Sequence, residues 1–422
     1  MALTTPKNPN YAAVVVRLTA VNALDRCDNI AGAPVLGYQA IVGKDRAAGD
    51  LGIVFTAETQ LSEEFARVNN QHSDTELNAD PAEKGYLEKT RRVRAIKLRG
   101  HRSDALFLPL EALAYTGFDI TKLAPGDTFD ELNGHPICAK YEVKKVGPAQ
   151  TQKNKAKTYE RVDRKHFHLH VDTDNYFRVA DSIPADAEII VTAKYHGTSW
   201  RGANTVVARQ LSWLERLAKK FGVRVQETEY DHVFGSRRVL KDINNPRQDH
   251  FYLSDIWSEY GARLGDLLPE GFIVFGELVG WTGDGAEIQA GYSYGLPKGT
   301  SQLFVYRVAQ INPQGRLTDL SWDQTVEFCD DHGLKTVPVL WRGKHRYFDV
   351  DQYLDVRFND IGYTQTLPLG ANKKIVDEGV VVRVEGLVPY LAKAKSAKFF
   401  EHETKQLDED VVDLETEGGV AA

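Results

Sequence analysis

The segment from Glu188 to Ser199 constrains the fold more than any other part of the chain. It contains an apolar, largely β-branched run that is typical of a buried strand, and this run ends at Lys194. Three residues later, Gly197 allows the backbone to approach another group closely. Lysine is normally a hydrated surface charge, so a lysine here is either used chemically or extends back to water. The segment alone favours the second explanation, and the rest of the chain must decide.

Length and composition bound the organisation of the protein. A chain of 422 residues is long for one domain, so two domains are expected. There is no apolar run of membrane-spanning length and no signal peptide after Met1, which predicts a cytoplasmic protein without a membrane partner. Three widely spaced cysteines lack zinc-ligand spacing and indicate a reducing compartment. A net charge of −7 does not exclude a nucleic-acid partner, because local patches bind phosphate.

The first part of the chain has the pattern of a small β domain. Strand-like runs at residues 11–22, 37–43 and 51–56 are separated by Gly/Asp turns, with no helical pattern between them. They predict a small antiparallel barrel or sandwich, which we place at residues 1–150. The basic segment at residues 90–102 is either a groove for a phosphate backbone or an edge strand protected by charge. Its candidate nucleic-acid contacts are Arg91, Arg92, Arg94, Lys97 and Arg99.

A polar and basic segment follows, and we interpret residues 151–170 as an inter-domain linker. His166, His168 and His170 alternate within it, so a strand would place three imidazoles on one face. No further cluster of metal-ligand residues supports a metal site there. The histidines are therefore predicted to form a polar strand face.

The second domain, placed at residues 171–402, mixes helices and strands. Apolar residues recur at helical spacing from Val207 to Phe221 and predict an amphipathic helix, either an added contact surface or packing. Another helix is expected at residues 254–268, and an acidic, mobile tail at residues 403–422. Apolar strands are expected at residues 272–279, 302–308 and 377–384.

Several of the apolar runs contain or precede a charged residue, which is unusual in a buried strand. Lys194, Glu277 and Glu378 interrupt such runs, and Lys393 and Lys395 follow another. Buried charges are costly unless they are paired or used, so the set forms either a site or internal ion pairs that hold a sheet together. Lys393 and Lys395 would share a face and suit one phosphate, while the carboxylates suit a ribose hydroxyl or a divalent cation.

Taken in order, these motifs resemble those of the covalent nucleotidyltransferases, the superfamily of ATP-dependent DNA ligases, RNA ligases and mRNA capping enzymes. The sequence Lys194-Tyr-His-Gly-Thr and the ending Lys393-Ala-Lys-Ser-Ala-Lys-Phe399 look like RNA ligases of the nick-sealing type. The runs that start at Gly37 and Arg91 resemble the N-terminal OB domain of one RNA ligase branch. The resemblance implies an α+β protein, with an N-terminal OB-type β-barrel followed by an antiparallel-sheet nucleotidyltransferase (ATP-grasp-like ligase) domain.

The resemblance also implies roles for the lysines and carboxylates. Lys194 would attack the α-phosphorus of ATP and hold AMP as a phosphoramidate, while Lys393 and Lys395 would contact that phosphate. As neighbouring cations they would keep Lys194 partly neutral. Glu378 would bind the catalytic Mg²⁺ or Mn²⁺, and Glu277 would bind the ribose of the nucleotide.

The remaining implied roles concern the base and the loop around the lysine. Tyr306, with Phe304 as the alternative, would stack on adenine. Arg237 would face the nucleotide or the RNA 5′-phosphate, with Arg201 as a weaker candidate. His196 and Gly197 would shape the loop that follows Lys194. A regular strand would turn Arg383 away from Glu378, which leaves Arg383 out of the expected site.

The implied activity is ATP-dependent joining of an RNA 3′-hydroxyl to a 5′-phosphate through lysyl-AMP and RNA-adenylate intermediates. The expected partner is RNA, in a nicked duplex that is sealed during repair, and the expected state is a monomer. One departure is Ala193, because RNA ligases commonly carry an acidic residue immediately before the lysine. The alternatives are a DNA ligase, a capping-type nucleotidyltransferase and an inactive OB-containing nucleic-acid-binding protein.

Overall fold

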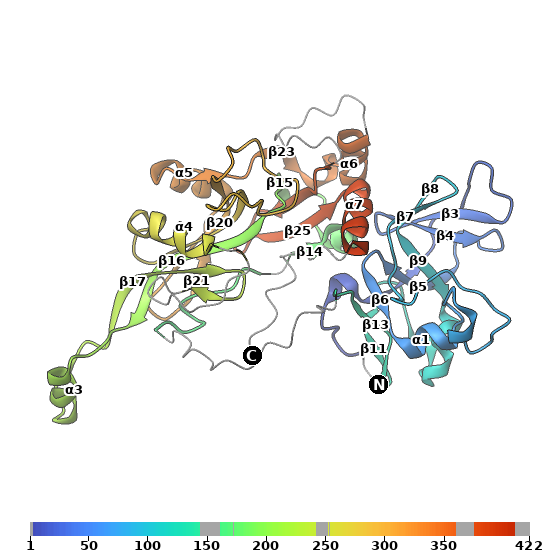
Figure 1. The fold of residues 1–422 in the computed structure, drawn as a ribbon. Helices are drawn as coiled ribbons and strands as arrows, with labels where there is room; N and C mark the ends of the chain where they lie inside the picture. The colour runs from blue at the N-terminus through green and yellow to red at the C-terminus, as the bar shows by residue number, and fades with distance from the viewer. Residues whose placement is uncertain are drawn as a thin grey trace. The chain divides into compact units, whose positions relative to one another are not determined.

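The chain folds into two compact units, each of which gathers segments that are distant in sequence (Figure 1). The computed structural model describes residues 3–143, 161–171, 173–241, 252, 254–359 and 375–409. The first unit comprises residues 1–144, 174–180 and 395–412. The second comprises residues 145–173, 181–394 and 413–422. Among the described helices, none is long and apolar enough to cross a membrane.

The first unit is built on a sheet of seven strands that buries both of its faces. Val15 and Phe55 pack into one apolar cluster, whereas Val14 and Val54 pack into another on the opposite face. Neighbouring strands are antiparallel except β4 and β9. The order is β10 (Thr128–Phe129), β1 (Ala13–Arg17), β5 (Leu51–Thr56), β9 (Ala105–Pro109), β4 (Tyr38–Gly43), β3 (Ile30–Val35) and β2 (Asn22–Ala23).

Short elements complete the first unit. Two helices in it lie far apart in sequence, and each buries a phenylalanine, Phe65 or Phe400, in one of the two clusters. These elements are α1 (Glu63–Val68), α2 (Tyr176–Val179), α7 (Ala397–Asp408) and the strand pairs β6 (Thr59–Leu61) with β13 (Cys138–Lys140), β7 (Ile96–Leu98) with β8 (His101–Ser103), and β11 (Glu131–Leu132) with β12 (His135–Pro136). The recorded pairings do not close the main sheet on itself, so the OB-type barrel stays a prediction.

The larger sheet of the second unit is covered by two helices, α4 (Ile256–Leu264) and α5 (Trp322–Asp331). Ile256 and Phe328 from these helices pack against Val274 of the sheet in one apolar cluster. Its strands run in the order β18 (Leu240–Lys241), β17 (Thr228–Ser236), β16 (Thr198–Ala208), β19 (Phe272–Gly280), β20 (Ser301–Ile311) and β21 (Leu317–Asp319), with β22 (Lys335–Thr336) parallel to β20.

A smaller sheet carries the lysine strand. Four of its strands lie in the order β25 (Tyr390–Lys395), β24 (Gly379–Val384), β15 (Glu188–Lys194) and β23 (Val339–Lys344). Strand β15 has antiparallel partners on both sides, and its side chains from Ile189 to Ala193 are all buried, so both of its faces are covered. Burial of both faces explains its apolar run. Helix α6 (Val350–Asn359) and the short strand β14 (Asp174–Asn175) are the remaining helix and strand of the described chain.

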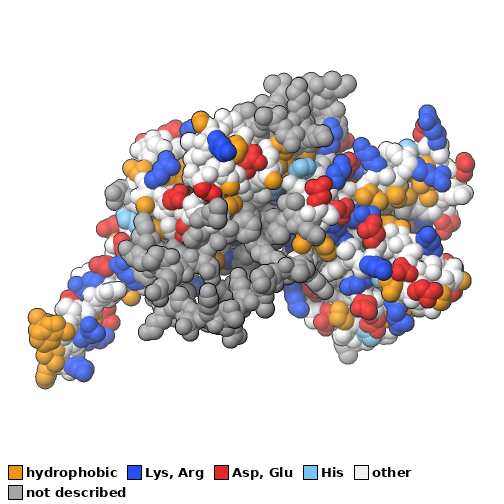
Figure 2. Space-filling model, viewed as in Figure 1, with side chains coloured by type: hydrophobic (Ala, Val, Ile, Leu, Met, Phe, Trp, Pro, Cys, Tyr) orange, Lys and Arg blue, Asp and Glu red, His pale blue; other side chains and the backbone are white. Residues whose placement is uncertain are grey.

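The helix predicted from Val207 to Phe221 differs from what the structure contains. Val207 lies in β16, and the helix α3 covers only Trp213–Lys220, at the tip of an arm formed by β16 and β17 (Figure 1). Its apolar side chains are exposed, with Trp213 at 68% and Phe221 at 79%, and Figure 2 shows them gathered at that tip. The apolar stripe therefore does not pack against the described part of the chain.

The structure also differs from the predictions for the three histidines and for the acidic tail. His166, His168 and His170 lie in turns and irregular backbone rather than on a strand. Helix α7 continues to Asp408, so the first residues of the expected acidic tail are helical. The rest of that tail, from residue 410, lies outside the described residues, as do residues 151–160 of the expected linker.

Candidate active site

The register of the smaller sheet places a lysine beside a carboxylate. Lys194 is opposite Gly379, so the preceding residue, Glu378, reaches the lysine. Lys194 Nζ lies 2.8 Å from Glu378 Oε2, and their side chains are 11% and 0% exposed. A buried ion pair is costly to desolvate, so its position at the mouth of a pocket is more informative than its contribution to stability.

The loop after the lysine is held on all sides. Tyr294 Oη accepts a hydrogen bond from the His196 backbone N–H at 2.7 Å, and Gln289 Nε2 donates to the Gly197 carbonyl. A Cβ on Gly197 would lie 2.2 Å from the Leu278 carbonyl oxygen, so only glycine fits there. His196 Nδ1 is 3.6 Å from Glu378 Oε2. Of the predicted loop residues, His196 therefore lies beside the Lys194–Glu378 pair, and Gly197 fixes the loop against β19.

A pocket opens in front of Lys194, and the faces of both sheets contribute to it. Strands β15, β24 and β25 supply one side, and β16, β19 and β20 supply the other. The lining residues are His170, Val171, Thr173, Thr192, Ala193, Lys194, Tyr195, Ser199, Arg237, Glu277, Tyr306, Trp322, Val337, Val381, Arg383, Leu391 and Lys393. Five predicted site residues thus meet in one pocket, although residues 194 and 393 are distant in sequence.

Of the two aromatic residues of β20 that are candidates for stacking on a base, one lines the pocket and the other packs on a neighbouring ring. Tyr306 lines the pocket, and its ring contacts the His170 ring edge to face at 4.9 Å between centroids. Phe304 instead stacks on Tyr195 at 4.4 Å and is not among the described lining residues. Tyr306 is therefore the ring available to a base in the pocket.

Positive charge gathers around His170. Burial lowers the pKa of His170 well below its usual value, and Arg307, Arg237 and Lys393 lower it further. His170 is consequently neutral at physiological pH, while the cations near it favour an anion in the pocket. On the opposite side, Glu277 is buried and accepts a hydrogen bond from Ser199 Oγ at 3.3 Å. The pocket therefore offers both cations for phosphate and a carboxylate for hydroxyl groups.

Two predicted contacts lie elsewhere. Lys395 belongs to the first unit, where its Nζ is 3.0 Å from Glu403 Oε1, and it is not among the described lining residues. Arg201 is buried beneath the pocket lining and donates to the carbonyls of Phe167, His168 and Ser236. Burial lowers its pKa to about 10. Arg201 therefore orders the backbone that leads to His170 and Arg237.

The basic segment of the first unit is only partly exposed. Arg92 is turned inward, where it pairs with Glu58 at 3.2 Å and with Asp408, and it is 3% exposed. Arg94 pairs with Glu88, whereas Lys97 and Arg99 are exposed near the β7–β8 turn. Arg91 is partly buried and donates to the Leu61 carbonyl. A continuous five-residue phosphate groove is therefore not supported, because Arg92 is used inside the unit.

Sequence reasoning missed several lining residues, among them His170, Trp322 and Arg383. Leaving Arg383 out of the site was wrong, because Arg383 lines the pocket and lies on the same face of β24 as Gly379, the partner of Lys194. Glu378 precedes β24, which begins at Gly379, so strand alternation does not fix where its side chain lies. Val381 and Arg383 are two residues apart on one strand and therefore share a face, and both line the pocket. This spacing is the sequence feature that could have indicated Arg383.

A sequence model of the RNA ligase family matches residues 187–399, just over half of the chain. The chain belongs to the RNA ligase family. This segment contains Lys194, Glu277, Tyr306, Glu378 and Lys393, the predicted residues that meet at or beside the pocket.

Solved structures of a Naegleria gruberi RNA ligase share the fold of this RNA ligase. A lysine-to-alanine variant with ATP and Mn is 15% identical in sequence to this chain. The match covers 94% of this chain and 99% of the Naegleria chain, with a TM-score of 0.59. The same enzyme with PPi is 16% identical, covers 93% and 98%, and gives a TM-score of 0.60. A lysine-to-methionine variant with AMP and Mn is 16% identical, covers 92% and 98%, and gives 0.58. No curated protein matches the chain in a sequence comparison.

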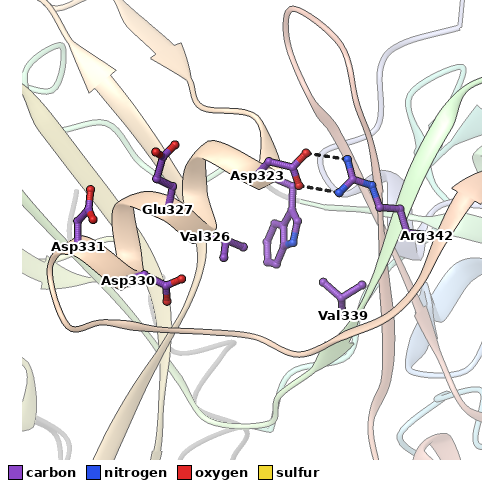
Figure 3. Close-up of a pocket in the computed structure, with 8 residues that line it drawn as sticks. Asp323, Val326, Glu327, Asp330, Asp331, Val339 and Arg342 are labelled. Carbon is purple, nitrogen blue, oxygen red and sulfur yellow. Dashed lines mark hydrogen bonds and ion pairs between the residues drawn. The ribbon is translucent and has the colours of Figure 1, made fainter.

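The RNA ligase has a second, wider hollow between α5 and β23 (Figure 3). Four carboxylates line it, from Asp323, Glu327, Asp330 and Asp331, and its one guanidinium, Arg342, is paired with Asp323 at 2.6 Å. This negative charge repels phosphate groups. The pocket in front of Lys194 is therefore the better site for a nucleotide.

Proposed function

We propose that this RNA ligase is ATP-dependent and that Lys194 is its nucleophile. The observation that carries the proposal is the 2.8 Å contact of Lys194 Nζ with Glu378, beside a pocket that Arg237, Glu277 and Lys393 line. A nucleotide needs cations for its phosphates, acceptors for its ribose and a ring for its base. Tyr306 supplies the ring in the same pocket.

In the first step, the Lys194 Nζ lone pair forms a bond to the α-phosphorus of ATP. The bond from that phosphorus to the bridging oxygen breaks, and pyrophosphate leaves with the electron pair. Before the attack, one proton of the Lys194 ammonium moves to Glu378 Oε2, which lies beside it. The second proton, which the nitrogen loses as the phosphoramidate forms, passes to water. Lys393 and Arg237 stabilise the charge that grows on the phosphoryl oxygens. Tyr306 stacks on adenine, and Glu277 accepts a ribose hydroxyl.

In the later steps, AMP passes from Lys194 to an RNA 5′-phosphate, and an RNA 3′-hydroxyl then displaces AMP to form the phosphodiester. Lys395 is proposed to join the phosphate contacts in one of these steps. We assign the first unit, as an OB-type domain, to holding RNA at a nick through Arg94, Lys97 and Arg99. The enzyme is proposed to act as a cytoplasmic monomer in RNA repair.

A divalent cation, Mg²⁺ or Mn²⁺, is part of the proposal. Within the described residues, no group of three His, Cys, Asp or Glu side chains is arranged to hold a metal ion. Mg²⁺ often binds one or two carboxylates together with substrate phosphates and water, and Glu378 supplies an oxygen ligand of that type. The bound ion would neutralise phosphate charge during transfer.

The deciding experiment is incubation of the purified protein with Mg²⁺ and ATP labelled on the α-phosphate, followed by denaturing electrophoresis. Label should remain on the wild-type chain and be absent from Lys194→Ala. Lys344→Ala, which removes a lysine from β23 of the same sheet, is the matched control and should label normally. No label on a folded protein, with Mn²⁺ also tried and bound AMP first discharged by pyrophosphate, would reject the proposal.

The labelled enzyme then allows the polynucleotide to be identified. Nicked duplexes with RNA or DNA at the 3′-hydroxyl strand, and single strands of each, should be joined at different rates. Fastest sealing of the RNA 3′-hydroxyl in a duplex supports the proposed substrate. Equal sealing of DNA supports a general polynucleotide ligase, and labelling by GTP in preference to ATP supports the capping-type reaction.

A further inference from the structure

Arg383 is a buried arginine of the nucleotide pocket with a nitrogen that makes no hydrogen bond. Its Nε donates to Glu385 Oε1 at 2.7 Å, and its Nη2 donates to the Leu320 carbonyl at 2.7 Å. Nη1 has no hydrogen-bond partner within the described structure. The side chain is 2% exposed, and the residue lines the pocket. An unsatisfied buried donor is costly, so a ligand that supplies an acceptor there would be bound more tightly.

The position of Arg383 in the sheet tells which part of a nucleotide would reach it. Arg383 is opposite Ile190 on β15, four residues before Lys194. At a strand rise of about 3.3 Å per residue, this corresponds to roughly 13 Å along the strand. An extended nucleotide with its α-phosphorus at Lys194 Nζ would therefore place its base, rather than its phosphates, toward Arg383.

The surroundings of Arg383 agree with this assignment. Val381 and Leu391, from β24 and β25, line the same pocket, as does Trp322 at the start of α5. Trp322 lies close to the arginine, because its backbone N–H donates to the same Glu385 Oε1. Apolar walls suit a flat base and disfavour a hydrated phosphate.

We propose that Arg383 is a base-contacting residue, and that its Nη1 donates a hydrogen bond to a ring nitrogen of adenine. The inference rests on the proposed ATP site and extends it. Adenine carries three such acceptors, N1, N3 and N7, and each is removed in the corresponding deaza analogue. Glu385 and the Leu320 carbonyl fix the guanidinium through its other nitrogens, so Nη1 is oriented before the nucleotide binds.

A purely structural role is the competing explanation, because the same arginine ties β24 to the start of α5. The two roles predict different results when protein and ligand are changed together. Loss of a structural tie weakens every purine nucleotide equally. Loss of a base contact removes the preference for the one nitrogen that was contacted.

The experiment is calorimetric titration of the full chain with AMP and with 1-deaza-, 3-deaza- and 7-deaza-AMP, after covalently held AMP has been discharged with pyrophosphate. AMP has no pyrophosphate leaving group, so only binding is measured. One analogue should bind the wild type roughly 10- to 100-fold more weakly than AMP, as a charge-assisted hydrogen bond predicts. The same analogue and AMP should bind Arg383→Met with equal affinity.

Arg342→Met, in the acidic hollow, is the matched control and should keep the wild-type discrimination. Equal binding of all four ligands to the wild type would overturn the inference, and this result needs no variant to fold. Discrimination that persists in Arg383→Met would also overturn it. A wild type that binds none of the four ligands and takes no label from ATP would reject the proposed function itself.

Discussion

At the scale of single residues, the Lys194–Glu378 pair explains why a lysine can end a buried strand. The carboxylate neutralises the ammonium where water is largely excluded, and in the proposed reaction it would accept the proton that must leave before Nζ attacks phosphorus. The pair thus holds Lys194 in a charged, ordered form. Removing either partner leaves an uncompensated group in a buried place.

Replacement of Glu378 by Gln should therefore slow lysine labelling by ATP about 100-fold or more, because both the proton acceptor and an anionic oxygen ligand are lost. The measurement is the rate of labelling in Mg²⁺ and in Mn²⁺. Glu188→Gln, at the exposed start of the same strand, should label at the wild-type rate. A Glu378→Gln variant that labels normally in both metals would remove Glu378 from the mechanism.

At the scale of elements, the loop from Tyr195 to Gly197 joins the two sheets. It leaves β15 after the lysine and enters β16, whose Ser199 is opposite Glu277 on β19. Close approach of Gly197 to β19 is what brings Lys194 and Glu277 into one pocket. Because Gly197 has no side chain, the loop can lie directly against β19.

Gly197→Ala should lower the labelling rate by at least tenfold and reduce the thermal stability of the second unit. The added Cβ would meet the backbone oxygen of Leu278 at 2.2 Å, and backbone cannot move aside as a flexible side chain can. Gly283→Ala is the control, because the nearest atom to its Cβ is 3.8 Å away and belongs to Glu259. Similar labelling by both variants would contradict this account.

At the scale of the whole molecule, the first unit contains a helix from late in the chain, α7. Helix α7 follows directly after Lys395, and Thr404 Oγ1 donates to Glu58 at 2.8 Å while Asp408 pairs with Arg92. Burial, together with the nearby Glu403 carboxylate, raises the pKa of Glu58 to about 7, although Arg92 acts to lower it. The C-terminal helix is thus tied to the first strands by a buried, titratable cluster.

This cluster predicts a pH dependence of stability. A raised carboxyl pKa means that the folded state binds the proton more tightly, so stability falls as pH rises from about 4.5 to about 7. The Glu58→Gln variant mimics the protonated acid and should gain stability relative to the wild type across that range, by on the order of 2–3 kcal/mol.

Thermal unfolding of both proteins between pH 5 and pH 8 measures the effect. Glu131→Gln, an exposed acid of the same unit, should show a constant difference from the wild type. A constant difference for Glu58→Gln as well would show that the carboxyl is ionised in the fold throughout this range.

The sequence by itself determined the buried strands and the family, and it singled out Lys194 as the candidate nucleophile. The apolar runs predicted at residues 188–193, 272–279 and 377–384 fall on strands, the last of which begins only at Gly379, because burial on both faces demands continuous apolar side chains. Lys194, Glu277 and Glu378 were found because charge is costly in such runs. These signals are local, so they can be seen without knowing what lies opposite.

The tertiary structure alone decided which polar groups meet. Arg92 and Arg94 lie two residues apart in sequence and both pair with Asp408, yet only Arg92 is fully buried, where it also pairs with the buried Glu58. Arg383 enters the pocket because β24 pairs with β15 in a register that puts Arg383 on the same face as Lys194, and α3 is exposed because β16 and β17 extend into an arm. Such outcomes depend on non-local contacts, which periodicity and composition do not encode.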